Sequence, residues 1–323
     1  MTLVKFAIMG AWMAQLAPAA AQQTYPGKAI RFIVPYAAGG SVDPLARLFT
    51  AKLNESLGQP MIVDLRPGGN TIIGTEAVAK AAPDGYTLLV MTVPNHAINA
   101  LLIRNLPYDS VKDFAAVASI STSDYVLVLH PSVPADNLKT FIAFAKARPG
   151  QLNYGSVGSA GISQLGTAQF SAMAGIQMQR IPYKGSAPAL IDLVSGQLQA
   201  GLNTPISAIQ HLHSRRLKAI AISGERRMPA LPEVPTFTEA GLPGFEMRVT
   251  YAVLAPAGTP RVIIDKLSGE FGRIVALTDI REKLAVQGMM PFYATSEQLA
   301  ANLKADLVKY AAVIKAGNIA LDN

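Results

Sequence analysis

The sequence predicts an α/β protein of two lobes, each with a mainly parallel sheet flanked by helices. Short apolar runs of strand type alternate with segments whose apolar residues recur at helical spacing. Short turns that contain Gly join the two kinds of segment, which is typical of βαβ units. The alternation runs in two series, and a stretch rich in Pro and Gly at 225–244 follows the second.

In the first series, strands are expected at 29–35, 61–64 and 87–92, and helices at 45–57, 74–82 and 95–102. The second series has expected strands at 125–129, 152–155, 178–181, 200–202 and 218–222, and helices at 138–146, 163–173, 187–195 and 207–213. A long surface loop at 225–244 then precedes a strand at 250–254 and helices at 261–276 and 296–315.

The last two helices are expected to return to the first lobe, so the chain crosses between the lobes twice, near Ser123 and near Tyr251. One lobe then contains residues 22–123 and 252–323, and the other contains residues 124–251.

The N-terminus is typical of a secretory signal peptide. One Lys lies in residues 1–5, no charged residue lies in 6–21, and small residues precede a cleavage position after Ala21. A membrane anchor is the alternative, but the uncharged stretch contains Pro18 and is shorter than the roughly 20 apolar residues of a spanning helix. We therefore expect residues 1–21 to be removed and the product to be periplasmic.

The composition excludes several classes of protein. Half the residues are hydrophobic and 15% are charged, which argues against disorder. The net charge of +7 is scattered and not interleaved with aromatic residues, so no nucleic-acid partner is expected, although anionic solutes are weakly favoured. The chain has no Cys, and therefore no thiol nucleophile and no Cys-based zinc site. No cofactor and no metal are expected.

Three turns between a strand and a helix are rich in Gly and Ser, at 36–41, 154–163 and 182–188. Glycine lets the backbone approach a ligand closely, and a helix N-terminus presents unpaired N–H groups and a partial positive charge. Each turn is therefore a candidate anion site. An ordinary turn capped by Ser41 or Asp43 is the alternative for the first of them. Three such turns in two lobes favour one shared crevice at the carboxyl ends of the strands.

Catalytic patterns are missing from the sequence. There is no G-x-S-x-G, Walker or G-x-G-x-x-G motif, and His211 and His213 are too close in sequence to share a metal from one helix. His96, at the start of an expected helix, is interpreted as an ordering hydrogen-bond partner because no motif places a nucleophile beside it. We expect no enzymatic activity, with a periplasmic hydrolase as the unfavoured alternative.

A series of ordered motifs then carries a resemblance over essentially the whole chain after residue 21. The motifs are Tyr-Pro-Gly-Lys at 25–28, Ala-Pro-Asp-Gly-Tyr-Thr-Leu-Leu at 82–89, Asn-His-Ala-Ile-Asn at 95–99, Leu-Pro-Tyr-Asp at 106–109, Pro-Gly-Gln-Leu-Asn-Tyr at 149–154, Pro-Tyr-Lys-Gly-Ser-Ala-Pro-Ala-Leu at 182–190 and Leu-Ala-Pro-Ala-Gly-Thr-Pro at 254–260. The chain resembles the receptors of tripartite tricarboxylate transporters, extracytoplasmic solute receptors also called the Bordetella uptake gene (Bug) family.

This resemblance implies a two-lobed periplasmic-binding-protein fold of type II-like form, with two crossing strands. It also implies a cleft in which backbone amides, hydroxyls and ordered waters hold one carboxylate of a small solute, which membrane subunits of a tripartite transporter then receive. A monomer is expected, and sensing without uptake is an alternative. The solute-binding residues expected, largely from the resemblance, are Tyr36, Ala38, Gly39, Gly40, Ser41, Asp43, Asn95, His96, Ser156, Gly158, Ser159, Gly161, Ser163, Tyr183, Lys184, Gly185 and Asn203.

The sequence departs from the family pattern at three places. Asn203 stands where the family commonly has Asp, and a neutral amide there is unsuited to a ligand ammonium. The solute is therefore predicted to be a carboxylate without an amino group, whether a di-, tri- or aromatic carboxylate. A usual Gly-Gly-Asn is replaced by Asn-Thr-Ile at 70–72, and a common His is Gln164. Both changes concern the far end of the expected pocket.

Overall fold

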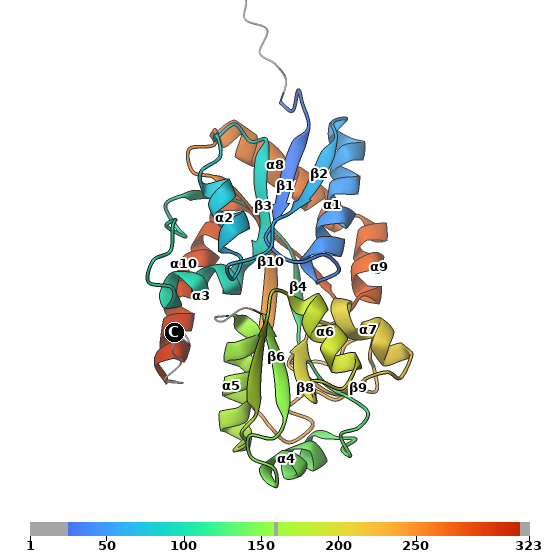
Figure 1. The fold of residues 1–323 in the computed structure, drawn as a ribbon. Coiled ribbons are helices and arrows are strands. Elements are labelled where there is room, and N and C mark those ends of the chain that lie inside the picture. The colour runs from blue at the N-terminus through green and yellow to red at the C-terminus, as the bar shows by residue number, and fades with distance from the viewer. Residues whose placement is uncertain (1–24, 158–160, 317–323) are drawn as a thin grey trace, which may run out of the picture.

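The computed structural model describes residues 25–157 and 161–316. The expected signal peptide, with its cleavage position after Ala21, lies outside these residues. Two lobes are stacked one above the other, and each is built around one sheet (Figure 1).

The first lobe contains a six-stranded sheet in the order β11-β4-β10-β3-β1-β2. Its strands are β1 (Ile30–Val34), β2 (Met61–Leu65), β3 (Thr87–Thr92), β4 (Phe114–Asp124), β10 (Arg248–Pro256) and β11 (Met290–Ala294). Strand β1 is parallel to β2 and β3, whereas β10 is antiparallel to β3 and β4, and β11 is antiparallel to β4. The helices of this lobe are α1 (Val42–Leu57), α2 (Ile72–Ala79), α3 (Val93–Leu102), α8 (Arg261–Ala276), α9 (Thr278–Val286) and α10 (Ser296–Ala316).

The second lobe contains a five-stranded sheet in the order β7-β6-β8-β5-β9. Its strands are β5 (Val126–Leu129), β6 (Asn153–Val157), β7 (Gln179–Tyr183), β8 (Ala200–Asn203) and β9 (Lys218–Ile222), and its helices are α4 (Leu138–Lys146), α5 (Ile162–Ala174), α6 (Ser186–Val194) and α7 (Pro205–His213). Strand β6 is parallel to β7 and β8, and β5 is antiparallel to β8 and β9.

The α/β class with two sheets flanked by helices is confirmed, but both sheets are mixed. The strands that run antiparallel to their neighbours lie at or next to the two crossings between the lobes. They are β4, β10 and β11 in the first sheet and β5 in the second. The sequence analysis missed β4, α9 and β11. Strand β4 is 11 residues long and reads FAAVASISTSD, and nearly all of it is buried. Its small Ala and Ser residues give a weak apolar pattern, yet they are buried because β10 and β11 pair with its two edges and α8 and α10 pack on it.

The stretch at 225–244 is not the surface loop that was expected. Phe237 is 1% exposed and packs against Phe170 and Phe245, with ring centroids 5.6 and 4.4 Å away. Met228, Leu231 and Val234 are also buried. This part of the chain has few helices or strands but contributes apolar side chains to the core of the second lobe.

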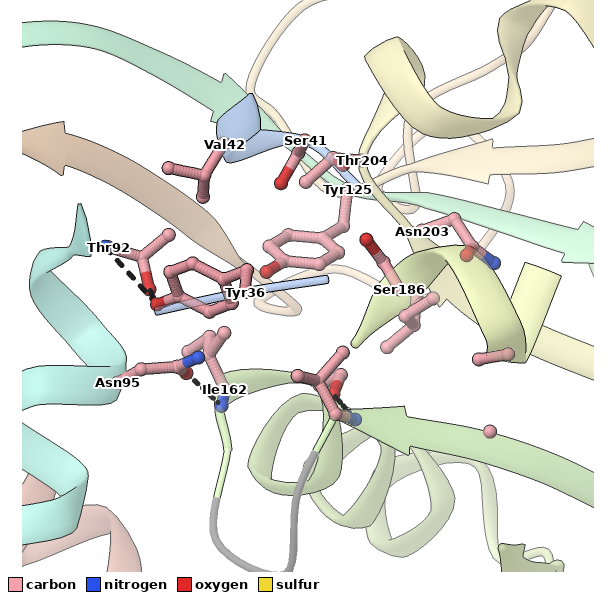
Figure 2. A pocket seen from close by; sticks show the side chains of 15 residues that line it. Tyr36, Ser41, Val42, Thr92, Asn95, Tyr125, Ile162, Ser186, Asn203 and Thr204 are labelled. Carbon is pink, nitrogen blue, oxygen red and sulfur yellow. Dashed lines mark hydrogen bonds between the residues drawn. The ribbon is translucent and has the colours of Figure 1, made fainter. Parts of the chain in front are cut away.

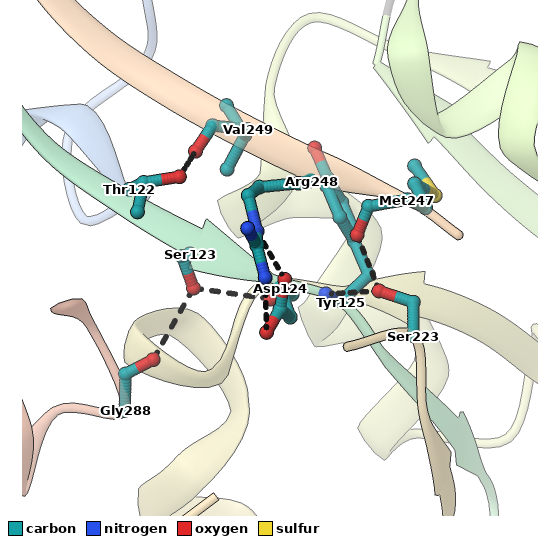
Figure 3. Close-up of polar contacts among 9 residues, drawn as sticks. All are labelled: Thr122, Ser123, Asp124, Tyr125, Ser223, Met247, Arg248, Val249 and Gly288. Carbon is teal, nitrogen blue, oxygen red and sulfur yellow. Dashed lines mark hydrogen bonds and ion pairs between the residues drawn. The ribbon is translucent and has the colours of Figure 1, made fainter. Parts of the chain in front are cut away.

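Two crossings connect the lobes, and polar bonds join them side by side (Figure 3). Strand β4 continues into β5 through Tyr125, whose N–H donates to Ser223 Oγ at 2.8 Å, and Ser223 Oγ in turn donates to the carbonyl of Met247. At the end of β4, Asp124 Oδ1 accepts from Arg248 Nε at 2.7 Å. Because β10 already pairs with β4 at Arg248, the second crossing segment lies before this residue, a few residues ahead of Tyr251.

Candidate ligand-binding site

A cavity of about 60 Å³ lies between the lobes, at the ends of β1, β3, β6 and β8 and beside the crossing at Tyr125. Figure 2 shows hydroxyl groups of Ser41, Tyr125 and Ser186 turned toward the same space. The residues that line the cavity are Tyr36, Ser41, Val42, Thr92, Asn95, Tyr125, Gly155, Val157, Ile162, Ser163, Ser186, Ala189, Leu202, Asn203 and Thr204. None of these side chains carries a formal charge, within the part of the chain that the structure describes.

Five helices begin at this cavity. Their N-cap or first residues are Ser41 of α1, Thr92 of α3, Ile162 of α5, Ser186 of α6 and Thr204 of α7, and all five line it. The first N–H groups of a helix have no partner within the helix, and its N-terminus carries about half a positive charge. The electrostatic field in the cavity therefore favours an anion, although none of the described residues that line it has a cationic side chain.

The caps of these five helices also differ from an ordinary cap. At α1, α3 and α7 the N-cap side chain accepts no backbone N–H of its own helix, and at α5 and α6 the N-cap is a glycine, which has no side chain. Helix α4, which begins away from the cavity, has a full capping box in which Asn137 Oδ1 accepts from Thr140 N at 2.9 Å. Apart from the first N–H of α5, which donates to Asn95, the helix ends at the cavity thus leave first-turn donors for a different acceptor, as in known anion sites at helix N-termini.

Asn95 connects the two lobes at the cavity. Its Oδ1 accepts a hydrogen bond from the backbone N–H of Ile162, at 2.9 Å and buried from solvent. Asn95 belongs to α3 of the first lobe and Ile162 opens α5 of the second. A side chain at Gly161 would meet the carbonyl oxygen of Val157 at 2.4 Å, so this approach requires glycine.

The hydroxyl of Tyr36 belongs to a small buried network. It lies 2.8 Å from Thr92 Oγ1 and accepts a hydrogen bond from Thr92 N at 3.4 Å. Burial raises the pKa of Tyr36, because the phenolate would lose its hydration, and burial also raises the pKa of Tyr125 far above its usual range. Both phenols therefore stay protonated at neutral pH and can donate hydrogen bonds to an anion.

The turn at 36–41 and the turn at 182–188 lie against each other across the two lobes. A Cβ atom at Gly40 would lie 2.9 Å from Ser186 Oγ, and one at Gly185 would lie 3.1 Å from Ala37 Cβ. Glycine at these two positions therefore permits the close approach of the lobes beside the cavity.

The structure brings several of the predicted residues together at this cavity. Tyr36, Ser41, Asn95, Ser163 and Asn203 line it, and Tyr183 and Lys184 line a second chamber next to it. The other described candidates lie near these residues in the chain but are not among the described residues that line the cavity. They are Ala38, Gly39, Gly40, Asp43, His96, Ser156, Gly161 and Gly185. Gly158 and Ser159 lie outside the described residues.

Asp43 and His96 have structural partners instead. Asp43 Oδ2 accepts from Gly39 N at 3.1 Å, and its Oδ1 accepts from Arg47 Nε at 2.7 Å, so it shapes the first turn. His96 is buried, its Nε2 lies 2.9 Å from the carbonyl oxygen of Ser110, and burial lowers its pKa to about 4. This arrangement matches the interpretation of His96 as an ordering hydrogen-bond partner.

Four hydroxyl-bearing residues of the cavity were not predicted: Thr92, Tyr125, Ser186 and Thr204. Three of them had a recognisable signal. Ser186 lies in the turn at 182–188, and Thr92 and Thr204 stand just before a helix whose first turn contains Pro94 or Pro205. Tyr125 had none, because its place follows from the missed strand β4.

The second chamber has a volume of about 200 Å³ and shares Val157 with the first cavity. It lies between residues 68–71 of the first lobe and residues 182–184 of the second. Asn70 and Thr71 have positive φ angles of 53° and 74°, a left-handed backbone that residues other than glycine rarely adopt.

Two further observations concern metal ligands and membrane-spanning helices. Among the described residues, no cluster of His, Asp or Glu has the arrangement of a metal site. No helix in the same part of the chain is long and apolar enough to cross a membrane.

Comparison with known proteins gives a consistent answer. The profile of the tripartite tricarboxylate transporter family receptors (TctC) matches residues 45–319. The protein BugT of Bordetella pertussis is 35% identical over 312 residues, which cover 96% of each chain.

Two solved structures from Rhodopseudomonas palustris add the fold and bound solutes. Rpa4515 with adipate is 32% identical with a TM-score of 0.89, and covers 92% of this chain and 99% of its own. MatC with bound malate is 30% identical with a TM-score of 0.84, and covers 90% of this chain and 100% of its own. The family model describes transporter receptors, and both of these structures contain a carboxylate solute. By its sequence and its two-lobed fold, the chain belongs to the tripartite tricarboxylate transporter family receptors, the Bug-type solute-binding proteins.

Proposed function

We propose that this protein is a periplasmic receptor that captures a small organic carboxylate between its lobes and delivers it to the membrane subunits of a tripartite transporter. The observation that carries the proposal is the meeting of five helix N-termini around one uncharged cavity. Backbone N–H groups and neutral hydroxyls can replace the water around a carboxylate without adding a competing charge.

The proposal includes closure of the lobes around the solute. Tyr36, Ser41 and Asn95 come from one lobe, and Ser163 and Ser186 come from the other, so neither lobe alone provides the whole donor set. A charge-assisted hydrogen bond is worth about 1.5–3 kcal/mol, and a micromolar affinity needs about 8 kcal/mol. Donors from both lobes are therefore needed, and hinge bending at the two crossings is the motion that would bring them together.

The solute class follows from the lining of the cavity. Asn203 lines the cavity with a neutral amide, and within the described residues no carboxylate is present there to pair with a ligand ammonium. A carboxylate without an amino group therefore suits the site better than an amino acid. Adipate and malate, the solutes of the two R. palustris structures, belong to this class.

A thermal-shift series tests the proposal. Malate, adipate, citrate and benzoate are compared with their neutral amides, which keep the shape of each solute but remove its charge. At 100 times the Kd, a ligand adds about 2.7 kcal/mol to the free energy of unfolding, which corresponds to about 5–10 °C in Tm. We expect such a rise with at least one acid and none with its amide. Equal shifts with both members of each pair would contradict the anion site.

Delivery and localisation have separate tests. The N-terminus of the exported protein is expected at Gln22, which Edman sequencing of the periplasmic fraction checks. Uptake of the identified solute should stop when the gene for this receptor is deleted and should return with the wild-type chain. Normal uptake in the deletion strain would favour a sensing role over transport.

A further inference from the structure

A third phenol lies behind the wall of the cavity between the lobes. Tyr251, on β10, is 0% exposed and is not among the described residues that line the cavity. Its hydroxyl has no hydrogen-bond partner among the described residues. A buried hydroxyl without a partner lowers stability, and Phe would fill the same space without this cost. A tyrosine at this position therefore points to a hydrogen bond that its hydroxyl gains when the protein binds a solute.

The pairing of β10 places the side chain of Tyr251 on the cavity side of the first sheet. Strand β10 lies between β3 and β4, and Tyr251 is directly opposite Thr92 of β3. Side chains directly opposite each other in an antiparallel pair lie on the same face of the sheet. Thr92 lines the cavity, and its Oγ1 lies 2.8 Å from the hydroxyl of Tyr36. Tyr251 therefore shares the face of Thr92 and lies just behind the residues of the wall.

Two hydroxyl groups of the cavity lie near the hydroxyl of Tyr251. They belong to Ser41, the N-cap of α1 in the first lobe, and to Thr204, the N-cap of α7 in the second. Burial raises the pKa of Tyr251, and these two hydroxyls oppose the rise because they can donate hydrogen bonds to the phenolate. The phenol therefore stays protonated at neutral pH and can itself donate a hydrogen bond to a neighbour.

Ser41 is the better acceptor of the two. Thr204 Oγ1 already lies 3.3 Å from Ser207 Oγ, whereas the side chain of Ser41 makes no capping hydrogen bond with its own helix. A hydroxyl oxygen can accept one hydrogen bond while its own proton is donated to another group. A hydrogen bond from Tyr251 to Ser41 Oγ would leave the Ser41 proton for an acceptor in the cavity, and linked hydrogen bonds of this kind strengthen one another.

From this arrangement we infer that Tyr251 is a positioning residue of the carboxylate site: its hydroxyl donates to Ser41 Oγ, and the Ser41 hydroxyl in turn donates to the carboxylate of the solute. The inference rests on the proposed function, since the Ser41 hydroxyl must meet a carboxylate in the cavity. Binding orients Ser41 for both hydrogen bonds, so the buried hydroxyl of Tyr251 gains its partner in the complex. Tyr251 thus contributes to affinity without touching the solute.

A double-mutant cycle, measured by isothermal titration calorimetry with malate, adipate, citrate and benzoate, tests the inference. For each acid that binds the wild-type protein, Tyr251→Phe should weaken binding about fivefold, the value of one net hydrogen bond. In a Ser41→Ala background the same change should weaken binding by less than about twofold, because the relay is already broken. Tyr108→Phe is the matched control and should leave the affinity unchanged. The Tyr108 hydroxyl is also buried without a partner among the described residues, but its ring packs against His96 and Phe114.

Thermal stability separates this role from a purely structural one. Without solute, Tyr251→Phe should have a Tm equal to or above that of the wild-type protein, because the hydroxyl that it removes has no partner among the described residues. Wild-type affinity of Tyr251→Phe, an undiminished effect in the Ser41→Ala background, or a Tm several degrees below that of the wild type would overturn the inference and leave carboxylate binding intact. Folded wild-type protein that binds none of the four acids would instead overturn the proposed function.

Discussion

Changing Asn95 to Asp would test the electrostatic basis of the site with almost no change of shape. The side chain of Asn95 lines the cavity between the lobes, and its Oδ1 accepts a hydrogen bond from the N–H of Ile162 in the other lobe at 2.9 Å. An Asp keeps this acceptor and adds one negative charge. In a cavity this small, a bound carboxylate would lie within about 5 Å of the new charge, and two like charges at that distance repel by about 3 kcal/mol at an effective dielectric constant of 20.

The expected result is a loss of carboxylate affinity of about 100-fold, measured by calorimetry at pH 7.5. The variant should remain folded, because a carboxylate near the N-terminus of α5 is stabilised by the helix dipole. Asn137→Asp is the matched control, since it makes the same change at the capped N-terminus of α4, away from the cavity. Wild-type affinity of Asn95→Asp would refute the placement of the anion in this cavity.

Three further predictions concern stability. Burial lowers the pKa of His96 from 6.5 to about 4, so below pH 6.5 the unfolded chain binds a proton at this residue that the folded protein does not bind. The free energy of unfolding should therefore fall by about 3 kcal/mol from pH 7 to pH 4. His96→Phe should remove this part of the pH dependence. Arg248→Gln leaves the carboxylate of Asp124, whose side chain is 8% exposed, without its ion-pair partner. It should lower the free energy of unfolding, measured in urea, by about 1–2 kcal/mol. Arg227→Gln, at an exposed ion pair, is the control and should lower it by under about 0.5 kcal/mol. Phe237→Ala should cost about 3–5 kcal/mol, because this ring lies in the core; a loss near zero would mean that the stretch at 225–244 is a surface loop after all.

Much of the fold could be predicted from periodicity, but its antiparallel part could not. Strand β1 and helix α1 follow from an apolar run, a Gly turn and Leu residues at helical spacing. Strand β4 has no such pattern, because its small Ala and Ser residues are buried beneath α8 and α10 and between its sheet neighbours β10 and β11. The sequence therefore predicted a crossing near Ser123 but not the strand that leads into it.

The residues of the candidate site could also be predicted only in part. Gly-containing turns mark the backbone that forms the cavity, so residues such as Ser41 and Asn95 could be selected from local patterns and from the resemblance. The side chain of Tyr125 could not, because its place follows from the unpredicted strand β4, whereas Ser186 lies in the expected turn at 182–188 but was not selected. The hydrogen bonds from Asn99 Nδ2 to the carbonyl of Asn70 and to Thr71 Oγ1 could not be predicted either, because they join segments far apart in the sequence.

The most direct test is the crystal structure of this protein with a bound dicarboxylate. We expect one carboxylate in the cavity between the lobes, within hydrogen-bonding distance of first-turn N–H groups of helices from both lobes, among them α1 of the first and α6 of the second. A solute bound to one lobe alone, or with its carboxylate away from every helix N-terminus, would contradict the account.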